Sequence, residues 1–325
     1  MRALVVTSMA PTPGNPARGS YVRDQVRALR ALGEADVELH EFLPGSPAAY
    51  LRAARDLRRR HHGRRYDIVH AHFGLAAWPA LAVGADKRVL TLHGTDLRHP
   101  RSRRITLAAL GRMDLVAAVS QELAGLVPGA GATRRVAVLP CGVATDRFTA
   151  RPRAEARRRL GLDPDGPYLL FPADPARAVK RFDRAREVAG DTPLLTLGHA
   201  APDDVPDWVN SASAVLVPSD SEGFGLAVLE ALACDVPVLA TPVGIHPTAL
   251  DGIRGTLCAD YDAHAWRAAL QPHLEAADPR VQGRARAERY GATAMARHVL
   301  TAWRELLEAP VHSPGTAPDS GANTP

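Results

Sequence analysis

Two glutamates eight residues apart form the strongest candidate for a ligand site in this 325-residue sequence. Glu222 precedes a turn that contains Gly223 and Gly225, and Glu230 lies inside the apolar, helix-periodic run that follows. An α-helix rises about 1.5 Å per residue, so a fully helical segment would place the two carboxylates roughly 12 Å apart along the axis. The pair is therefore suited to opposite ends of one long polar ligand.

The surroundings of each carboxylate indicate which groups it would bind. Glu230 is flanked by four apolar residues: Val228, Leu229, Ala231 and Leu232. A carboxylate in such company needs strong hydrogen-bond donors, such as a vicinal diol, to offset its desolvation. Glu222 precedes the helix and can reach a second set of hydroxyl groups.

The backbone between the two glutamates is a candidate anion site. The N–H groups from Gly223 through Phe224 and Gly225 to Leu226 stand at the start of a predicted helix, and a helix N-terminus favours negative charge. Gly244, after a later apolar run, would let a phosphate approach the backbone in the same way.

Arg177 and Lys180 stand just before another predicted helix. An arginine can bind two phosphate oxygens at once and a lysine acts as a point charge, so the two cations form a suitable clamp for a diphosphate. The alternative is that they are ordinary exposed cations, since Arg181 and Arg184 lie close by in the sequence.

Short apolar runs alternate with helix-periodic segments along most of the chain, which is the pattern of an α/β fold with doubly wound parallel sheets. His93 follows the run at 89–92, and active groups on such a sheet belong at the C-terminal ends of strands. We expect helices after residues 96, 119, 183 and 225, and at 20–32, 47–61, 203–211, 262–276 and 283–308. We expect strands at 3–6, 36–43, 67–70, 89–92, 115–119, 136–139, 168–171, 194–197, 214–217 and 236–240.

The length suggests two domains, each with its own core. A basic stretch at 151–159 opens the second half, so we place a first Rossmann-like domain at 1–149 and a second at 150–282. A terminal helix should occupy 283–309. Residues 310–325 are rich in Pro, Gly, Ser and Thr, which predicts a disordered tail.

Composition excludes several classes of protein. No apolar run approaches the ~20 residues of a membrane span, and the apolar start at 3–6 is too short for a signal peptide, so a cytoplasmic location is the default expectation. The three cysteines, Cys141, Cys234 and Cys258, are widely spaced and indicate neither a disulfide framework nor a zinc site. The net charge of +5 fits an acidic partner, and no recognised nucleic-acid-binding motif is present.

Cofactor and metal motifs are also missing. The first loop lacks the G-x-G-x-x-G sequence of a dinucleotide site, which argues against an NAD enzyme. Asp163 with Asp165, and Asp203 with Asp204, fall where exposed turns are expected. We expect no cofactor and no metal, because side-chain cations and helix N-termini can neutralise a bound diphosphate.

The helix predicted at 47–61 begins a strongly basic segment that extends to residue 65. Its apolar residues are Leu51, Ala54 and Leu57. Such a helix could lie against an anionic membrane surface, which would make the protein peripheral to the inner face of the membrane. A solvated basic face is the alternative. The basic residues are Arg52, Arg55, Arg58, Arg59, Arg60, His61, His62, Arg64 and Arg65.

The segments 218–219, 222–225 and 230–233 together resemble the EGFG and E-x7-E signature of the retaining glycosyltransferases of family 4. That family has the GT-B architecture, in which two Rossmann-like domains face each other across a cleft. The resemblance implies that Glu230 binds the nucleotide ribose. It also implies that Glu222 and the amides of Phe224 and Gly225 contact the donor sugar.

Further segments extend the resemblance over roughly residues 1 to 309. His93 begins an HGTD sequence similar to the family's HG-x-D element, whose histidine lies near the reacting sugar and the diphosphate. Arg177 and Lys180 match an R-x-x-K pair, and Gly19 is the best match to a first-loop glycine that approaches the donor phosphates. The architecture also implies that the terminal helix crosses back to the first domain, which would bind the acceptor.

The sequence departs from the family pattern in three segments. The first loop has Gly19 but lacks the family's usual double glycine. Segment 140–148 resembles PNGVD-x-x-x-F, but Cys141 replaces the asparagine and Ala144 the aspartate. After Gly244 the chain reads Ile-His-Pro-Thr, where the family commonly continues G-G-x-x-E, so that acidic residue is absent.

Together these patterns predict a retaining glycosyltransferase that moves a sugar from a nucleotide-sugar donor to a glycan, lipid-linked or small-molecule acceptor. The setting suggested by the segment 198–214 is cell-surface polysaccharide biosynthesis. Two alternatives stay open: another GT-B enzyme, such as a sugar-nucleotide epimerase or a phosphorylase, and an inactive protein that binds nucleotide sugars. The predicted catalytic residues are His93, Arg177, Lys180 and Glu222, and the predicted donor-binding residues are Gly19, Phe224, Gly225, Leu226, Glu230 and Gly244.

Overall fold

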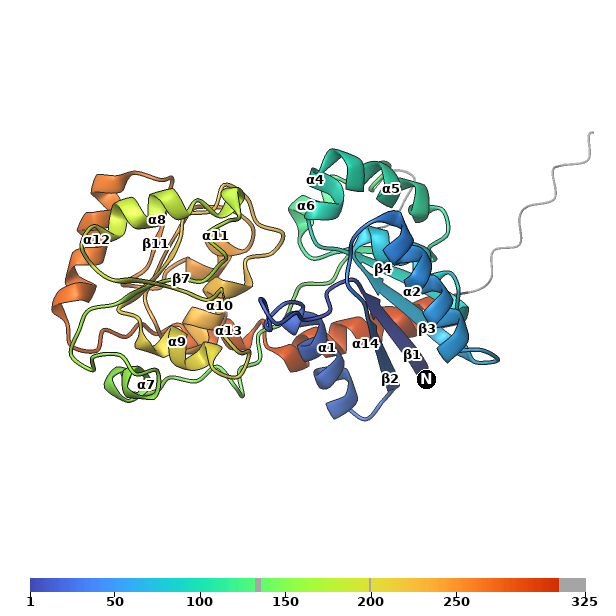
Figure 1. Cartoon of the computed structure of the whole chain (residues 1–325), viewed down its shortest axis with the longest axis horizontal. Helices are drawn as coiled ribbons and strands as arrows, with labels where there is room; N and C mark the ends of the chain where they lie inside the picture. Colours follow the sequence, from blue (N-terminus) through green and yellow to red (C-terminus); the bar gives the residue numbers. More distant parts are fainter. Residues whose placement is uncertain (132–135, 199, 310–325) are drawn as a thin grey trace, which may run out of the picture.

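A computed structural model describes residues 1–131, 136–198 and 200–309, and it contains two α/β domains side by side (Figure 1). The predicted tail at 310–325 lies outside the described residues. The first sheet has six parallel strands in the order β2-β1-β3-β4-β5-β6, and the second has five in the order β11-β10-β9-β7-β8. These two sheets are the predicted doubly wound, parallel α/β architecture.

The first domain contains β1 (Arg2–Thr7), α1 (Ser20–Ala31), β2 (Asp36–Glu41), α2 (Pro47–Arg60), β3 (Arg65–His72), η1 (Gly74–Ala76), α3 (Ala77–Ala80), β4 (Gly84–Leu92), α4 (Thr95–Arg98), α5 (Pro100–Leu110), β5 (Leu115–Ala118), α6 (Gln121–Gly125) and β6 (Val136–Val138). The second contains α7 (Arg153–Arg159), β7 (Leu169–Phe171), η2 (Ala178–Lys180), α8 (Phe182–Ala189), β8 (Leu194–Thr196), α9 (Val205–Ser211), β9 (Ala214–Val217), α10 (Leu226–Ala233), β10 (Val238–Ala240), α11 (His246–Leu250), β11 (Leu257–Cys258) and α12 (Ala263–Glu275). The chain ends in α13 (Arg284–Glu288) and α14 (Ala292–Glu308).

The strands form where the sequence offers short apolar runs, because a parallel sheet covered on both faces needs apolar residues on both sides of each strand. All four residues of β9 are buried, as are all three of β7. The predicted strands at 3–6, 89–92 and 214–217 therefore lie in the sheets, and the structure lengthens two of them to Arg2–Thr7 and Gly84–Leu92.

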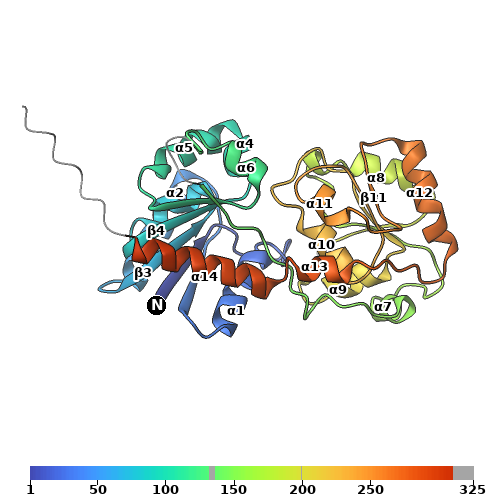
Figure 2. The same cartoon turned by 180° about the vertical axis from the view of Figure 1, so that it is seen from behind.

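The terminal segment packs on the first domain, as Figure 2 shows from behind. Met295, Val299 and Trp303 of α14 are buried against the face of the first sheet that also carries Val22 and Val26 of α1. The prediction of one continuous helix at 283–308 is wrong. Gly291 is extended between α13 and α14, because the backbone of Val143 takes both hydrogen bonds there: its N–H donates to Tyr290 and its carbonyl accepts from Ala292.

The strand orders place a crevice at the same point of each sheet. In the first sheet β1 lies between β2 and β3, and in the second β7 lies between β8 and β9. Connections leave toward opposite faces at these points, and in open α/β sheets ligands bind in the crevice outside the C-terminal ends of the strands there. The two domains thus bring two such crevices together.

Candidate active site

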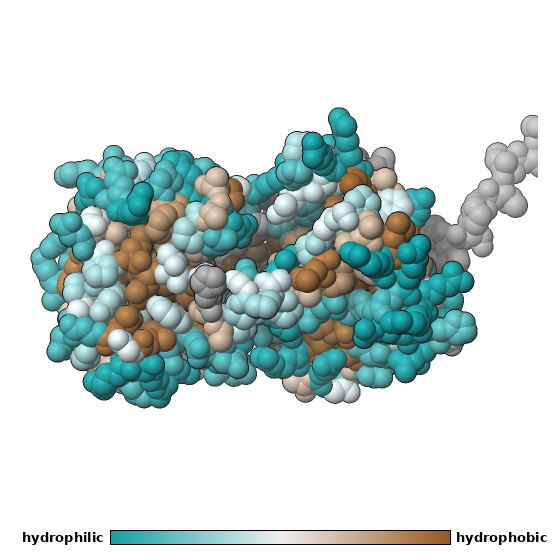
Figure 3. All heavy atoms as spheres, in the orientation of Figure 1, coloured by the Kyte–Doolittle hydropathy of each residue, from teal (hydrophilic) through white to brown (hydrophobic). Residues whose placement is uncertain are grey.

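A cleft of about 590 Å³ lies between the C-terminal ends of the two sheets. The first domain lines it with residues that follow β1, β3 and β4, including Ser8, Phe73 and His93. The second domain lines it with the segment after β7 and with the loop after β9. Figure 3 shows the hollow between the two lobes. The strand topology and the cleft therefore identify the same place.

The loop after β9 forms the second-domain wall. Gly225, at φ 102°, directly precedes α10, and a Cβ on it would lie 2.6 Å from Nε2 of the buried His246. A Cβ on Gly223 would lie 2.0 Å from the backbone carbonyl oxygen of His93. Both glycines are therefore needed for close packing, and Gly223 brings the backbones of the two domains into contact. Phe224, Gly225 and Leu226, all predicted donor-binding residues, line the cleft.

Lys180 and Glu222 form one unit in this wall. Nζ of Lys180 lies 2.6 Å from each carboxylate oxygen of Glu222, and the hydroxyl of Ser219 donates to Oε1 at 2.8 Å. Burial alone would raise the pKa of Glu222, but the Lys180 cation and the Ser219 hydrogen bond hold it below its ordinary value. The pair therefore presents both charges to the cleft in a fixed geometry.

Arg177 differs from the other cations around it. Arg181 and Arg184 both pair with Asp220, at 3.2 Å and 2.8 Å, and Arg181 also pairs with Asp183. Arg177 lines the cleft, is exposed, and has no acidic partner within 4 Å among the described residues. It is the cation of this group that can bind an incoming anion without first breaking an ion pair.

Glu230 faces the junction of the two domains. Burial raises its pKa to about 7, an effect that Arg147 opposes and Asp24 reinforces. Arg147 donates a hydrogen bond to Asp24 at 2.8 Å, so Asp24 already occupies part of that guanidinium. Glu230 is not among the residues that line the cleft; it lies four residues beyond Leu226, which does line it. Among the described residues no side chain forms an ion pair with Glu230, so its predicted contact with the ribose remains a prediction.

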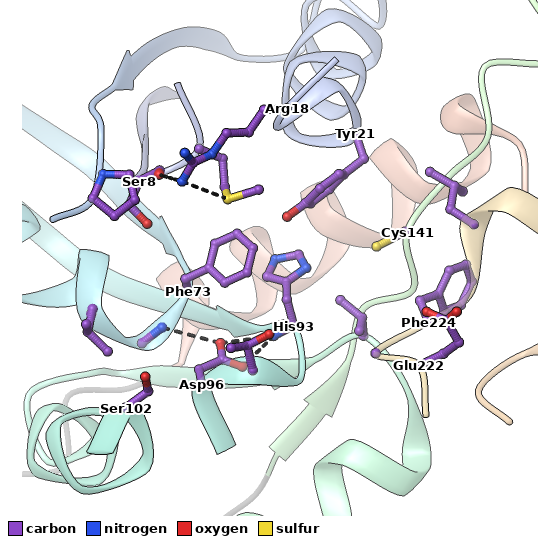
Figure 4. Close-up of a pocket in the computed structure, with 18 of the residues that line it drawn as sticks. Ser8, Arg18, Tyr21, Phe73, His93, Asp96, Ser102, Cys141, Glu222 and Phe224 are labelled. Carbon is purple, nitrogen blue, oxygen red and sulfur yellow. Dashed lines mark hydrogen bonds between the residues drawn. The ribbon is translucent and has the colours of Figure 1, made fainter. Parts of the chain in front are cut away.

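The first-domain wall is built around His93. The carboxylate of Asp96 accepts hydrogen bonds from the N–H groups of His93 and Gly94, at 3.0 and 2.7 Å, and from that of Gly74 at 3.3 Å. These bonds satisfy the buried aspartate and fix the turn after β4. The ring of His93 stacks on Phe73 with centroids 4.5 Å apart, and Figure 4 shows it between Phe73 and Tyr21.

Gly19 and Gly244 lie behind the walls and are not among the residues that line the cleft. Gly19, at φ 70°, precedes α1, and a Cβ there would lie 2.3 Å from the backbone oxygen of Met9. Gly244, at φ 58°, would place a Cβ 2.4 Å from the backbone oxygen of Phe224. Each glycine lets a loop pack closely, so their predicted contacts with phosphate remain predictions.

Several site residues escaped the prediction from sequence. Arg98 donates from Nη1 to the carbonyl oxygen of Glu222 at 3.0 Å and so ties the first domain to the second-domain loop. Arg18 and Tyr21 line the cleft near the start of α1. Behind His93, Nδ1 of His72 lies 3.0 Å from Nε2 of His93. For His72 the sequence did offer a signal: the alternation His-Ala-His at 70–72 ends an otherwise apolar strand.

The described residues include no group of three or more His, Cys, Asp or Glu side chains arranged to hold a metal ion. No helix in this part of the chain has both the length and the apolar character needed to cross a membrane.

The prediction that Leu51, Ala54 and Leu57 form one apolar side of α2 needs correction. Leu57 is buried in the core, as is Ala53, whereas Leu51 is 58% exposed on the same helix as the arginines.

Comparison with known sequences links both halves of the chain to sugar transferases. Residues 5–147 match the family described as Glycosyltransferase Family 4, and residues 172–276 match Glycosyl transferases group 1. A D-inositol 3-phosphate glycosyltransferase of Actinosynnema mirum is 32% identical, with 73% of this chain and 72% of the relative covered. One of Pseudarthrobacter chlorophenolicus is 31% identical, with 77% and 72% covered.

Comparison with solved structures supports the architecture. A sucrose-phosphate synthase from Thermosynechococcus elongatus superimposes with a TM-score of 0.71 at 20% identity, covering 94% of this chain and 99% of the other. Anabaena HepE in complex with UDP and glucose gives 0.68 at 16% identity, covering 93% and 99%. At these identities the likeness concerns the fold, which is GT-B.

Proposed function

Because this chain belongs to glycosyltransferase family 4, and is therefore a nucleotide-sugar-dependent glycosyltransferase, we propose that it transfers its sugar with retention of configuration at the anomeric carbon. The observation that carries this proposal is the cleft itself. It has the exposed cation Arg177 and the Lys180–Glu222 pair on one wall and His93 on the other, with the crevices of both sheets opening into it.

The second domain would bind the donor. Arg177, Lys180 and the N–H groups at the start of α10 would neutralise the departing diphosphate, which gains charge in the transition state. Glu230 would accept hydrogen bonds from the ribose hydroxyls, and Glu222 would contact the donor sugar while it holds Lys180 in place. Arg177, Lys180 and the N–H groups of α10 would supply the positive charge, so no metal ion would be needed.

The first domain would bind the acceptor, an alcohol whose hydroxyl becomes the new glycosidic oxygen. Its wall carries the guanidinium of Arg18, which donates to the backbone oxygen of Ser8 at 3.1 Å, and the hydroxyl-bearing Tyr21 and Tyr50. A cation among hydroxyl groups suits a polyol that carries a phosphate, and the relatives named above act on D-inositol 3-phosphate. A glycan or a lipid-linked acceptor in cell-surface polysaccharide biosynthesis is the second class to test.

We also propose that the protein meets the inner face of the membrane through α2. Five arginines between residues 52 and 60 are exposed on this helix, and the side chains of Leu43 and Leu51, 49% and 58% exposed, lie beside them. Exposed apolar residues within a basic helix are suited to an anionic lipid surface.

The deciding experiment incubates the full-length protein with UDP-, GDP- or ADP-sugars, together with inositol phosphates, glycans or lipid-linked saccharides. Thermal shift identifies the donor first, because a ligand at 100 times its Kd stabilises by about 2.7 kcal/mol. NMR of the product then reads the anomeric configuration. Release of an altered sugar without any acceptor would identify an epimerase. Inversion at the anomeric carbon, or donor binding with no turnover, would overturn the proposal.

A further inference from the structure

A line of buried polar side chains continues from His93 away from the cleft. Nε2 of His93 lies 3.0 Å from Nδ1 of His72, near the end of β3. Nε2 of His72 in turn lies 3.4 Å from the amide nitrogen Nε2 of Gln25, on α1. Each ring nitrogen along this line has one partner, and the line ends at a side-chain amide.

These three side chains have little contact with water. His72 is 1% exposed and Gln25 is 8% exposed, while His93 is half-buried and lines the cleft. Burial lowers the pKa of His72 to about 3 and that of His93 well below its ordinary value. Both rings are therefore neutral near pH 7, and a neutral imidazole has one N–H donor and one bare nitrogen acceptor.

A donor at one end of this line fixes every later position. In the structure the amide of Gln25 turns its nitrogen, not its oxygen, toward Nε2 of His72. In this orientation of the amide the nitrogen donates, so Nε2 of His72 accepts and the proton of His72 sits on Nδ1. That proton is donated to Nε2 of His93, which is then the bare nitrogen of its ring. The remaining nitrogen of His93, Nδ1, therefore carries a proton.

We infer that Gln25 and His72 are positioning residues that hold His93 as the Nδ1–H tautomer, so that it offers a hydrogen-bond donor to an oxygen of the bound substrate. This inference rests on the proposed function for the identity of that oxygen, a sugar hydroxyl or a diphosphate oxygen of the donor. The opposite tautomer would present a bare nitrogen and would repel an anionic oxygen.

The side chains packed around His93 fix the position of its ring but not its tautomer. Phe73 stacks on its ring, Tyr21 lies 5.3 Å away between centroids, and Asp96 fixes its backbone N–H. These contacts determine where the ring lies (Figure 4) but not which nitrogen carries the proton. Ring position and proton position thus come from different residues.

The chain contains a matched control in His70. It lies on the same strand, is fully buried and stacks on His72 with centroids 4.5 Å apart. Its Nε2, however, bonds to Thr91 at 2.7 Å, outside the line that leads to His93. Replacing His70 removes a similar buried imidazole without changing the hydrogen bonds between Gln25, His72 and His93.

The test is ¹⁵N NMR of the full-length protein labelled at histidine, because the two ring nitrogens have different shifts when protonated and bare. We expect His93 with Nδ1 protonated in the wild-type protein and in His70→Phe. Gln25→Glu replaces the donor with an acceptor, so we expect the proton of His93 to move to Nε2. We also expect kcat to fall about tenfold in Gln25→Glu with little change in KM, because a donor used in the transition state is lost.

Wild-type His93 protonated at Nε2 would overturn the inference, as would a tautomer that Gln25→Glu leaves unchanged. Gln25→Met, which has a similar shape and no amide, should give a mixture of both tautomers, and a single retained Nδ1–H form would also count against the inference. The NMR measurement needs no substrate, so it separates the two proposals. If the protein shows the expected tautomer but turns over no donor, the proposed function would be refuted and the tautomer inference would stand.

Discussion

Lys180 and Glu222 should behave as one unit in stability and in catalysis. Replacing Lys180 with alanine leaves the Glu222 carboxylate buried, with Ser219 as its one remaining hydrogen-bond donor among those described. Breaking a buried ion pair by removing one partner costs about 3–5 kcal/mol, because the other charge stays desolvated. The double variant Lys180→Ala, Glu222→Gln removes that charge and should recover much of the loss.

The assay is urea denaturation of the wild type, both single variants and the double variant at pH 7.5. Groups in contact give coupling energies of about 0.5–3 kcal/mol in such a cycle, and we expect a value above about 1 kcal/mol. Arg181→Ala is the matched control, since Arg181 pairs with Asp183 and Asp220 and does not contact Glu222. Single-variant losses that add to within about 0.5 kcal/mol would refute the reasoning.

The pH dependence of stability provides an independent check on whether the charge of Glu222 stabilises or destabilises the folded protein. The folded pKa of Glu222 lies below its ordinary value, so its contribution to stability is present above the unfolded pKa and is lost as the pH falls through the folded pKa. In Lys180→Ala burial acts without the cation and raises this pKa. The variant should therefore recover stability relative to wild type as the pH falls from 7.5 toward 5. Turnover in the double variant should be no slower than in Lys180→Ala, because the two side chains act together.

Three further predictions concern the donor and the membrane. The pKa of Glu230 is about 7, and we propose that its ionised form accepts hydrogen bonds from the ribose. Donor KM should therefore fall by up to about tenfold between pH 6 and pH 8, and Glu230→Gln should show no such change. Steady-state kinetics would test this. A chelator should leave turnover nearly intact, and activity restored by magnesium or manganese would contradict the metal-free mechanism. Anionic vesicles should sediment the wild type more strongly than Arg55→Glu, Arg58→Glu, whereas equal binding would exclude α2 as the contact.

Much of the fold could be predicted because its strands are apolar runs bounded by turn residues. The buried run at 214–217 is a strand, and the helix predicted after 225 begins at Leu226. The error in the helix predicted at 283–308 has a long-range cause. The sequence around Gly291 gives no sign that the backbone of Val143, far earlier in the chain, forms hydrogen bonds with Tyr290 and Ala292.

The candidate site shows the same division between local and distant information. Residues at strand ends, such as His93, are predictable because parallel strands bring their C-terminal ends to one edge of the sheet. Their partners are not, because Lys180 and Glu222 are 42 positions apart and His72 and His93 are 21 apart. Only the structure shows that Lys180, predicted to bind the diphosphate, and Glu222, predicted to contact the sugar, are hydrogen-bonded to each other.

Glu222 therefore links the chemistry of the cleft to the contact between the domains. Its side chain holds Lys180, its carbonyl oxygen accepts from Arg98 of the first domain, and the next residue, Gly223, touches the backbone of His93. A rotation that opened the cleft would separate Gly223 from His93 and strain or break the Arg98 hydrogen bond. Because the same residue anchors both ends, such a motion would be transmitted directly to the carboxylate that orients Lys180. If the donor binds at the second domain as we propose, its binding and the position of the first domain should for this reason be energetically coupled.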